Sequence, residues 1–203
     1  MGNIKLGITL YSFTKEYCQG LMSLEDCIHT AKELGAEGFE IVATQMIPSY
    51  PYVSDKFLGE FKSMCQYYDI EPVCYGANMD RGMWYHRDLS LDQMVEMAIN
   101  DLKSANRLGT NVIREQYLLP PEGLVKLAPY AEDFGIHVGI EIHNPETPNT
   151  PIMREYLQAI KESGSSYIGF VPDFGCFATK PNKPHWDQAI KNGGNLTLME
   201  KAR

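Results

Sequence analysis

Cysteine is scarce in this sequence, and no two cysteines form a Cys-x-x-Cys pair. The chain of 203 residues contains five cysteines, an odd number, at positions 18, 27, 65, 74 and 176. Disulfide frameworks use cysteines in pairs, and cysteine-based zinc sites use closely spaced ones. The pattern argues against both classes, and we expect reduced thiols.

Long hydrophobic runs are missing as well. No apolar stretch approaches the roughly 18 residues that suggest a membrane-spanning helix. The first residues, MGNIK, lead into a strand-like stretch without the apolar core of a signal peptide. We therefore expect a cytoplasmic protein that has no membrane partner.

Basic residues are fewer than acidic residues in this sequence. Eighteen Lys and Arg residues stand against 26 Asp and Glu residues, so the formal net charge is -8. The phosphate backbone of a nucleic acid would repel such a chain, and we exclude nucleic acid as a partner. The hydrophobic content of 44% is typical of a globular protein, and the length suits a single domain spanning residues 1–203.

A glycine-rich GxGxxG loop is absent where a dinucleotide-binding fold would need one. After the first apolar segment the chain reads GITLYS, residues 7–12. The missing loop holds the pyrophosphate in doubly wound sheets. Its absence favours a barrel over that fold.

A helix that ends in a glycine and is followed by a short apolar strand recurs along the chain. The glycines are Gly35, Gly109, Gly135 and Gly164. Glycine past a helix end adopts the left-handed conformation, and near-continuous apolar strands are typical of a parallel sheet covered on both faces. The pattern predicts about six strands, at residues 6–11, 38–42, 72–76, 111–115, 137–141 and 167–171.

Two helices carry further signals. Ser23 precedes one of them as an N-cap residue. In the other, apolar residues recur with helical period and should face the core; they are Leu91, Met94, Val95, Ala98, Leu102 and Ala105.

This array of strand and helix units predicts a (β/α)₈ TIM barrel, truncated after about six units. A barrel of this kind needs eight strands to close. We expect the chain to be a fragment, or another chain to supply the remaining units.

Polar residues follow the fifth and sixth expected strands, where barrel enzymes place their reactive groups. Glu141 and His143 share one face of the fifth strand, and Asp173 lies in phase at the end of the sixth. A carboxylate flanked by Ile140 and Ile142 is costly to desolvate without a partner, and a divalent ion is one such partner.

Alternatives remain open for each of these residues. Glu141 could instead pair with Arg114 from the neighbouring strand, and Asp173 could cap the following loop. His143 could be hydrogen-bonded at the barrel rim, or it could act as a base or substrate ligand.

The segments GIEIHN (139–144) and VPDFGC (171–176) resemble the xylose-isomerase-like superfamily, which includes sugar phosphate isomerases and epimerases. The resemblance extends over nearly the whole chain. It implies a divalent ion, Mn²⁺ or Mg²⁺ or Co²⁺, held by Glu141 and Asp173. Two further ligands, a histidine and a glutamate on the seventh and eighth strands, have no counterpart here. Many relatives also have a histidine where this chain has Cys176.

Several other residues are candidates for substrate contacts. Glu40 and Arg114 lie toward strand ends and could bind hydroxyls or a carboxylate, or form a rim salt bridge. Trp84 and His86 belong to an aromatic loop that could stack on a sugar face or pack on the barrel. Cys176 completes this set, although a packed thiol is the simpler interpretation.

The resemblance implies a metal-dependent sugar isomerase or epimerase that abstracts a proton next to a carbonyl. A narrower resemblance, carried by the segments 46–51, 139–146 and 172–177, is to the α-subunits of C-glycoside deglycosidases. Those manganese lyases eliminate an aglycone from a 3-keto sugar and work with a small β-subunit, with His143 here as the candidate base. Accordingly we expect an oligomer.

The related endonuclease IV group needs many histidines and a basic groove, which this chain lacks. A non-catalytic sugar-binding or structural subunit is the remaining alternative.

Overall fold

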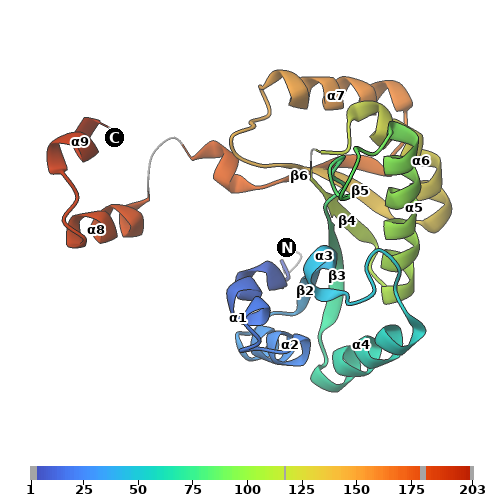
Figure 1. Ribbon diagram of the computed structural model, residues 1–203, viewed down its shortest axis with the longest axis horizontal. Coiled ribbons are helices and arrows are strands. Elements are labelled where there is room, and N and C mark those ends of the chain that lie inside the picture. The colour runs from blue at the N-terminus through green and yellow to red at the C-terminus, as the bar shows by residue number, and fades with distance from the viewer. Residues whose placement is uncertain (1–3, 117, 179–181, 202–203) are drawn as a thin grey trace.

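Within the residues described by the computed structural model, 4–116, 118–178 and 182–201, parallel strands form one six-stranded sheet (Figure 1). The strands are β1 (Gly7–Thr9), β2 (Gly38–Val42), β3 (Glu71–Ala77), β4 (Val112–Glu115), β5 (His137–Ile142) and β6 (Ile168–Pro172). Each strand pairs in parallel with the next one along the chain. A doubly wound sheet would reverse its strand order at a switch point, whereas this sequential order is that of a TIM-type barrel.

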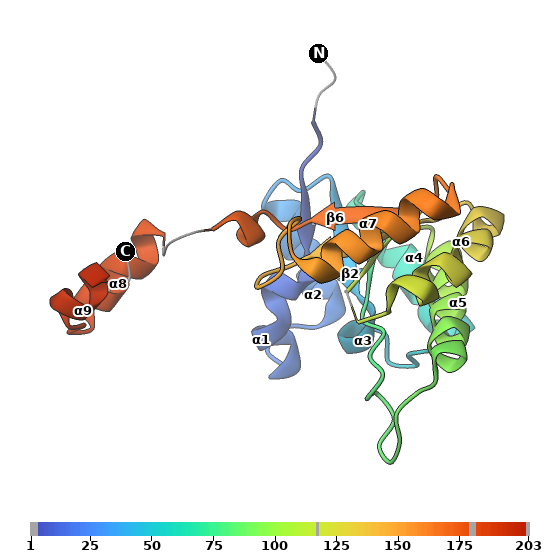
Figure 2. The same ribbon diagram turned by 90° about the horizontal axis from the view of Figure 1, so that it is seen from above.

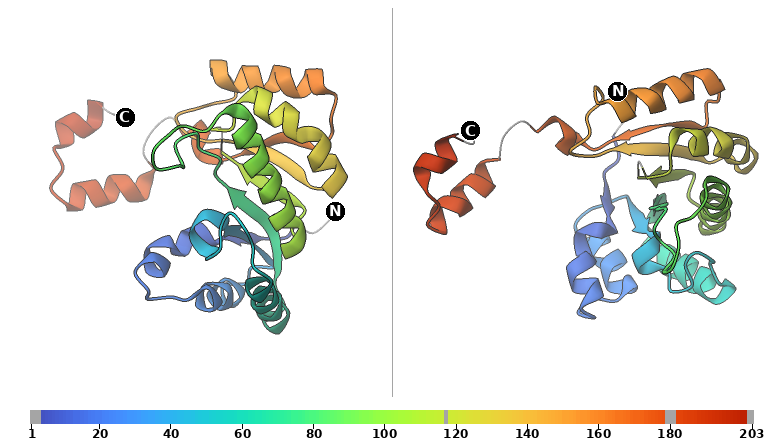
Figure 3. Two further views of the ribbon diagram at one scale, coloured as in Figure 1. Left: turned by 45° about the vertical axis from the view of Figure 1, so that its right-hand side comes forward. Right: turned by 45° about the horizontal axis from the view of Figure 1, so that its top comes forward.

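Helices connect the strands and pack against the outside of the sheet (Figures 1 and 3). The longest, α5, contacts both β3 and β4, and its neighbour α6 contacts β5 and β6. The α-helices are α1 (Thr14–Cys18), α2 (Leu24–Glu33), α3 (Ala43–Met46), α4 (Asp55–Tyr68), α5 (Leu91–Leu108), α6 (Pro121–Phe134), α7 (Pro151–Ser163), α8 (Lys183–Lys191) and α9 (Leu196–Lys201). Short 3₁₀ helices, η1 (Leu10–Phe13) and η2 (Phe174–Phe177), follow β1 and β6.

The expected helix signals act as the sequence predicts. Ser23 caps α2 through a capping box in which its side chain and that of Asp26 bond each other's backbone N–H groups. The glycines after α5, α6 and α7 have φ of 90°, 65° and 67°, the left-handed conformation that a side chain would strain. These local signals therefore set where the helices begin and end.

The core lies between the sheet and the helices. Phe39 and Ile41 of β2 are fully buried, and so is Tyr75 of β3. On α5 the predicted stripe is buried from Met94 to Ala105, while Leu91 at the first turn is only partly buried. Burial of these side chains stabilises the fold through the hydrophobic effect.

The first strand is shorter than the sequence pattern suggests. We expected it to run over 6–11, but it ends at Thr9 because the Thr9 side chain accepts a hydrogen bond from the Tyr11 backbone N–H and caps η1. A polar side chain at the strand end thus turns the chain into a 3₁₀ helix.

The two ends of the chain add little to the core. Helices α8 and α9 stand away from the sheet in Figures 1 and 2 and contain no buried residue. In the described part of the chain, none of the helices has the length and apolar content to cross a membrane. Residues 1–3, part of the segment judged to lack a signal-peptide core, lie outside the described residues.

Candidate active site

A cavity of about 480 Å³ lies at the carboxyl ends of the strands. Five residues predicted from the sequence line it together; they are Glu40, Arg114, Glu141, His143 and Asp173. They come from the ends of β2, β4, β5 and β6, which is where a barrel of this type gathers its reactive groups. Thr9, Tyr11 and Gln116 also line the cavity and were not predicted, although each lies at or just after the end of a strand.

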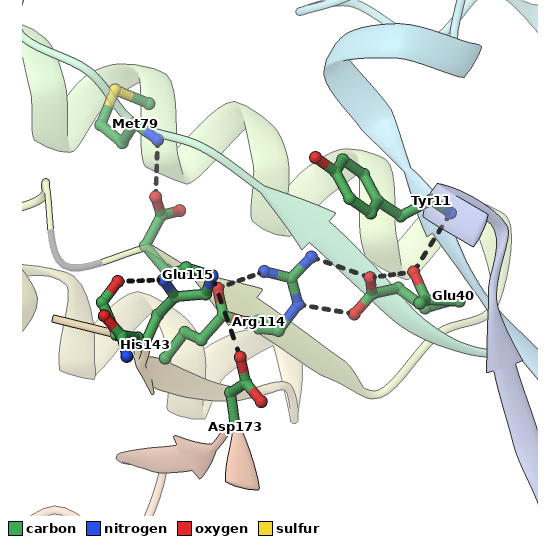
Figure 4. A network of polar contacts seen from close by, with 10 residues as sticks. Tyr11, Glu40, Met79, Arg114, Glu115, His143 and Asp173 are labelled. Carbon is green, nitrogen blue, oxygen red and sulfur yellow. Dashed lines mark hydrogen bonds and ion pairs between the residues drawn. The ribbon is translucent and has the colours of Figure 1, made fainter. Parts of the chain in front are cut away.

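Arg114 lies between two carboxylates in this cavity (Figure 4). Its Nε and Nη2 atoms each donate a 2.8 Å hydrogen bond to Glu40, and Nη1 donates one of 2.6 Å to Oε2 of Glu141. Glu40 also accepts a 2.7 Å bond from the Thr9 hydroxyl. The sequence left open whether Glu141 pairs with Arg114, and in the structure it does.

The strand next to Arg114 provides the space for this arrangement. Arg114 of β4 is in register with Gly76 of β3 on one side and Gly139 of β5 on the other. A Cβ atom on Gly76 would lie 3.1 Å from Nη2 of Arg114 and 3.2 Å from Oε1 of Glu40. Because Gly76 has no side chain, the guanidinium can reach across β3 to the carboxylate on β2.

Burial and charge both act on this pair. Burial alone would raise the pKa of Glu40, but the hydrogen bonds and charge of Arg114, with a contribution from Thr9, hold it below its ordinary value. Burial opposes the charge on Arg114, yet Glu40 and Glu141 together raise its pKa. Glu40 and Arg114 therefore remain ionised at neutral pH, and charge-assisted hydrogen bonds hold this pair together.

His143 follows the end of β5, and its side chain is half-exposed in the cavity. Its Nδ1 atom lies 2.7 Å from the Asn144 carbonyl oxygen, which can only accept a hydrogen bond. Nδ1 therefore carries the proton of the neutral ring, and the lone pair is on Nε2, the geometry of a base. Nε2 lies 3.8 Å from Oδ2 of Asp173.

Asp173 begins η2. Its Oδ1 atom accepts a 2.8 Å hydrogen bond from the Gly175 backbone N–H, which is the capping role that the sequence left as an alternative. The Oδ2 atom remains directed toward His143 (Figure 4). One oxygen of the Asp173 carboxylate thus caps η2, and the other faces the cavity.

The residues around this cavity fit part of a divalent-ion site. Glu141 lies on β5, Asp173 directly follows the adjacent strand β6, and both line one space. Carboxylate oxygens are suitable ligands for Mg²⁺ or Mn²⁺. Among the described residues, Oε1 of Glu141 makes no hydrogen bond, so this oxygen is available. No three acidic, histidine or cysteine side chains of the described chain converge closely enough to hold an ion by themselves.

Other predicted contacts lie elsewhere. Trp84 lines a separate hollow with Tyr50, against α5, and Arg87 stacks over its ring at 4.7 Å. His86 contacts Tyr85 edge-to-face in the same loop, which projects from the sheet in Figure 2. Cys176 is buried in η2. None of the three lines the cavity with Glu141, and their role in substrate binding stays a prediction.

Two buried acidic residues were missed by sequence reasoning. Asp101 of α5 and Glu115 of β4 are each 1% exposed. Burial raises the pKa of Asp101 to about 7, and burial with the charge of Asp101 raises that of Glu115 to about 8. Tyr75 donates a 2.9 Å bond to Asp101, and Glu115 accepts the Met79 N–H (Figure 4). The sequence signal available for Asp101 was its position next to the apolar stripe of α5.

Comparison with known proteins agrees with this fold. The family model of the xylose isomerase-like TIM barrel matches residues 28–196. The chain belongs to this family. The chain is similar in structure to a xylose isomerase-like TIM barrel protein from Mycobacterium smegmatis, whose crystal structure contains magnesium. The two superpose with a TM-score of 0.64 over 92% of this chain and 71% of that one. At 13% identity, that likeness concerns the fold alone.

Two curated relatives are more similar in sequence. A 3'-dehydrocarminate deglycosidase alpha subunit from a Microbacterium species is 34% identical over 178 residues, which is 87% of this chain and 51% of the relative. A C-glycoside deglycosidase alpha subunit from Arthrobacter globiformis is 36% identical over 174 residues, which is 84% and 49%. The chain therefore spans about half the length of the curated relatives that it matches.

Proposed function

We propose that this cavity abstracts a proton from the carbon next to a carbonyl group in a sugar-derived substrate, with His143 as the base. The observation that carries the proposal is the position of His143: its Nδ1–H is directed to a backbone carbonyl, which leaves Nε2 to accept a proton inside the cavity. General bases of this kind are most often histidines with one nitrogen fixed by a hydrogen bond.

We infer that Glu141 and Asp173 hold a divalent ion, Mn²⁺ or a related ion such as Mg²⁺ or Co²⁺. When bound, such an ion polarises the substrate carbonyl and so acidifies the neighbouring C–H group. Two carboxylates fill only part of its coordination, and the other positions would be taken by water, substrate oxygens or protein groups that these residues do not supply.

The finer assignment that we propose is a carbon–carbon lyase of the C-glycoside deglycosidase alpha-subunit type, acting on 3-keto C-glycosides. In that reaction the C–H bond next to the ketone breaks, its electron pair forms a C=C bond in the sugar, and the bond from the sugar to the aglycone carbon breaks. The aglycone carbon then takes up a proton, so atoms and electrons balance. The two curated relatives, at 34% and 36% identity, support this choice.

A sugar isomerase or epimerase is the second candidate, because it begins with the same proton abstraction and the same cavity would serve it. The names of the relatives also suggest a second subunit, and we propose a small partner chain in an oligomer, with a sugar conjugate as substrate. A non-catalytic sugar-binding or structural subunit would retain the cavity but would not need the lone pair of His143.

The test compares substrates in the presence of Mn²⁺. The purified full-length protein, with and without the product of any small neighbouring gene, is incubated with 3-keto C-glucosides and separately with free ketoses, and the products are separated by liquid chromatography. We expect release of aglycone, and we expect none from the His143→Ala variant. Conversion of ketoses without aglycone release would overturn the lyase assignment, and an inert protein in every incubation would point to the non-catalytic alternative.

A further inference from the structure

Arg114 divides its hydrogen bonds unequally between the two carboxylates. Nε and Nη2 form a two-bond pair with both oxygens of Glu40, whereas only Nη1 reaches Glu141. A planar two-bond pair fixes both position and orientation of a guanidinium. Glu40 therefore anchors Arg114, and the anchored guanidinium presents a single donor to Glu141.

The bond to Glu141 uses one carboxylate oxygen and leaves the other. Oε2 accepts from Nη1 at 2.6 Å, and within the described part of the chain Oε1 has no hydrogen-bond donor. An incoming cation at Glu141 thus meets one oxygen that is already bonded to a positive group. Two-oxygen ligation would place the cation beside the positive guanidinium, and charge repulsion disfavours that arrangement.

Low solvent exposure strengthens the electrostatic interactions among these side chains. The side chains of Arg114, Glu40 and Glu141 are 16%, 12% and 11% exposed, so water screens them only weakly. Two negative groups and one positive group leave this row with a net single negative charge. Removal of either partner of the Glu40–Arg114 pair changes that charge at a fixed place beside Glu141.

We propose that Arg114, anchored by Glu40, is a positioning residue that favours ligation of a divalent ion through Oε1 of Glu141 alone and lowers the affinity of the site for that ion. The proposal rests on the metal site of the proposed function. It differs from a direct role of Glu40 and Arg114 in binding substrate, because it assigns their effect to the ion.

The test is a titration of the full chain with Mn²⁺, followed by electron paramagnetic resonance of the free ion, on the wild type and three variants. Arg114→Met removes the positive group and frees Oε2, so Mn²⁺ should bind about tenfold more tightly. Glu40→Gln leaves the positive group uncompensated, so Mn²⁺ should bind about tenfold more weakly. The double variant restores the charge of the row, and its affinity should lie between the two, near that of the wild type.

Matched controls come from an ion pair on the helices, Arg107 with Asp55. Arg107→Met and Asp55→Asn change the net charge of the protein by the same amounts, and neither should alter Mn²⁺ binding. A loss of packing would weaken binding in every cavity variant, whereas positioning by charge moves the two single variants in opposite directions. Circular dichroism establishes that each variant is folded.

Each outcome is decisive. Weaker binding in Arg114→Met, or tighter binding in Glu40→Gln, would overturn the proposal while the metal site itself stands. If Arg114→Met does not fold, Arg114→Gln, which also removes the positive group, takes its place, and tighter Mn²⁺ binding is again the expected result. A wild-type protein that takes up no Mn²⁺ would overturn the metal site of the proposed function, and this inference with it.

Discussion

The Nε2 atom of His143 lies 3.8 Å from Oδ2 of Asp173, at the junction between the ends of β5 and β6. The two residues are thirty positions apart in the sequence and meet because parallel strands bring their carboxyl ends to one edge of the sheet. The proposed base and the proposed metal ligand thus share one space, and different substitutions should separate their roles.

We expect Glu141→Gln and Asp173→Asn to weaken Mn²⁺ binding and to lower turnover together, each by on the order of tenfold or more, because affinity follows the number and charge of the ligands. Calorimetric titration and a product assay provide the two measurements. Glu155→Gln, an exposed residue of α7, is the control for loss of one negative charge. Full Mn²⁺ binding with normal turnover in both cavity variants would refute the assignment.

His143→Ala should lower kcat by about 100-fold or more, the usual contribution of a general base, while Mn²⁺ stays bound. In deuterated water, the wild type should transfer deuterium to the substrate carbon and the variant should not. Mass spectrometry of recovered substrate measures this exchange. If the variant loses Mn²⁺ instead, His143 is a ligand and the base must be sought elsewhere.

Asp101 and Glu115 should make the protein less stable as the pH rises. Their carboxyl pKa values are raised by burial, to about 7 and about 8, above the values near 4 of an unfolded chain. The folded state therefore binds more protons than the unfolded state between about pH 4 and pH 8, and the stabilisation present below pH 4 is lost as the pH rises through 7 and 8.

Urea unfolding at pH 5 and pH 8.5 measures this loss, which we expect to be on the order of several kcal/mol for the two groups together. The groups that face the two carboxyls are Tyr50, Tyr75 and Tyr156, with Arg114 the cation that favours ionised Glu115. Asp101→Asn and Glu115→Gln should each flatten the pH dependence. Glu96 is an exposed carboxylate on α5, the helix that carries Asp101, and Glu96→Gln should leave the pH dependence of stability unchanged.

Gly76→Ala should destabilise the fold by about 1–3 kcal/mol, because its Cβ would lie 3.1 Å from Nη2 of Arg114 and displace the pair with Glu40. Gly59→Ala is the matched control: a Cβ there meets no atom within 4 Å, and alanine is the better helix former in α4. Urea unfolding of both variants gives the comparison. Equal stability of Gly76→Ala and the wild type would show that β3 tolerates a side chain beneath the guanidinium.

Local patterns in the sequence determined the succession of strands and helices. The glycine after each of several helices and the stripe on α5 are set by neighbours within a few residues, so the sequence alone was enough to place them. The phase of Glu141, His143 and Asp173 at two strand ends likewise follows from alternation along a strand. The family resemblance then added the fold and the type of chemistry.

Tertiary structure decided what these residues contact. Arg114 reaches Glu40 only because the register of β2, β3 and β4 sets Gly76 between them, and register depends on residues far apart in the chain. The burial of Asp101 and Glu115 depends in the same way on how α5 packs against β3 and β4. Sequence periodicity specifies which face a side chain is on, whereas the partner it meets depends on the packing of separate elements, and only the folded chain contains that information.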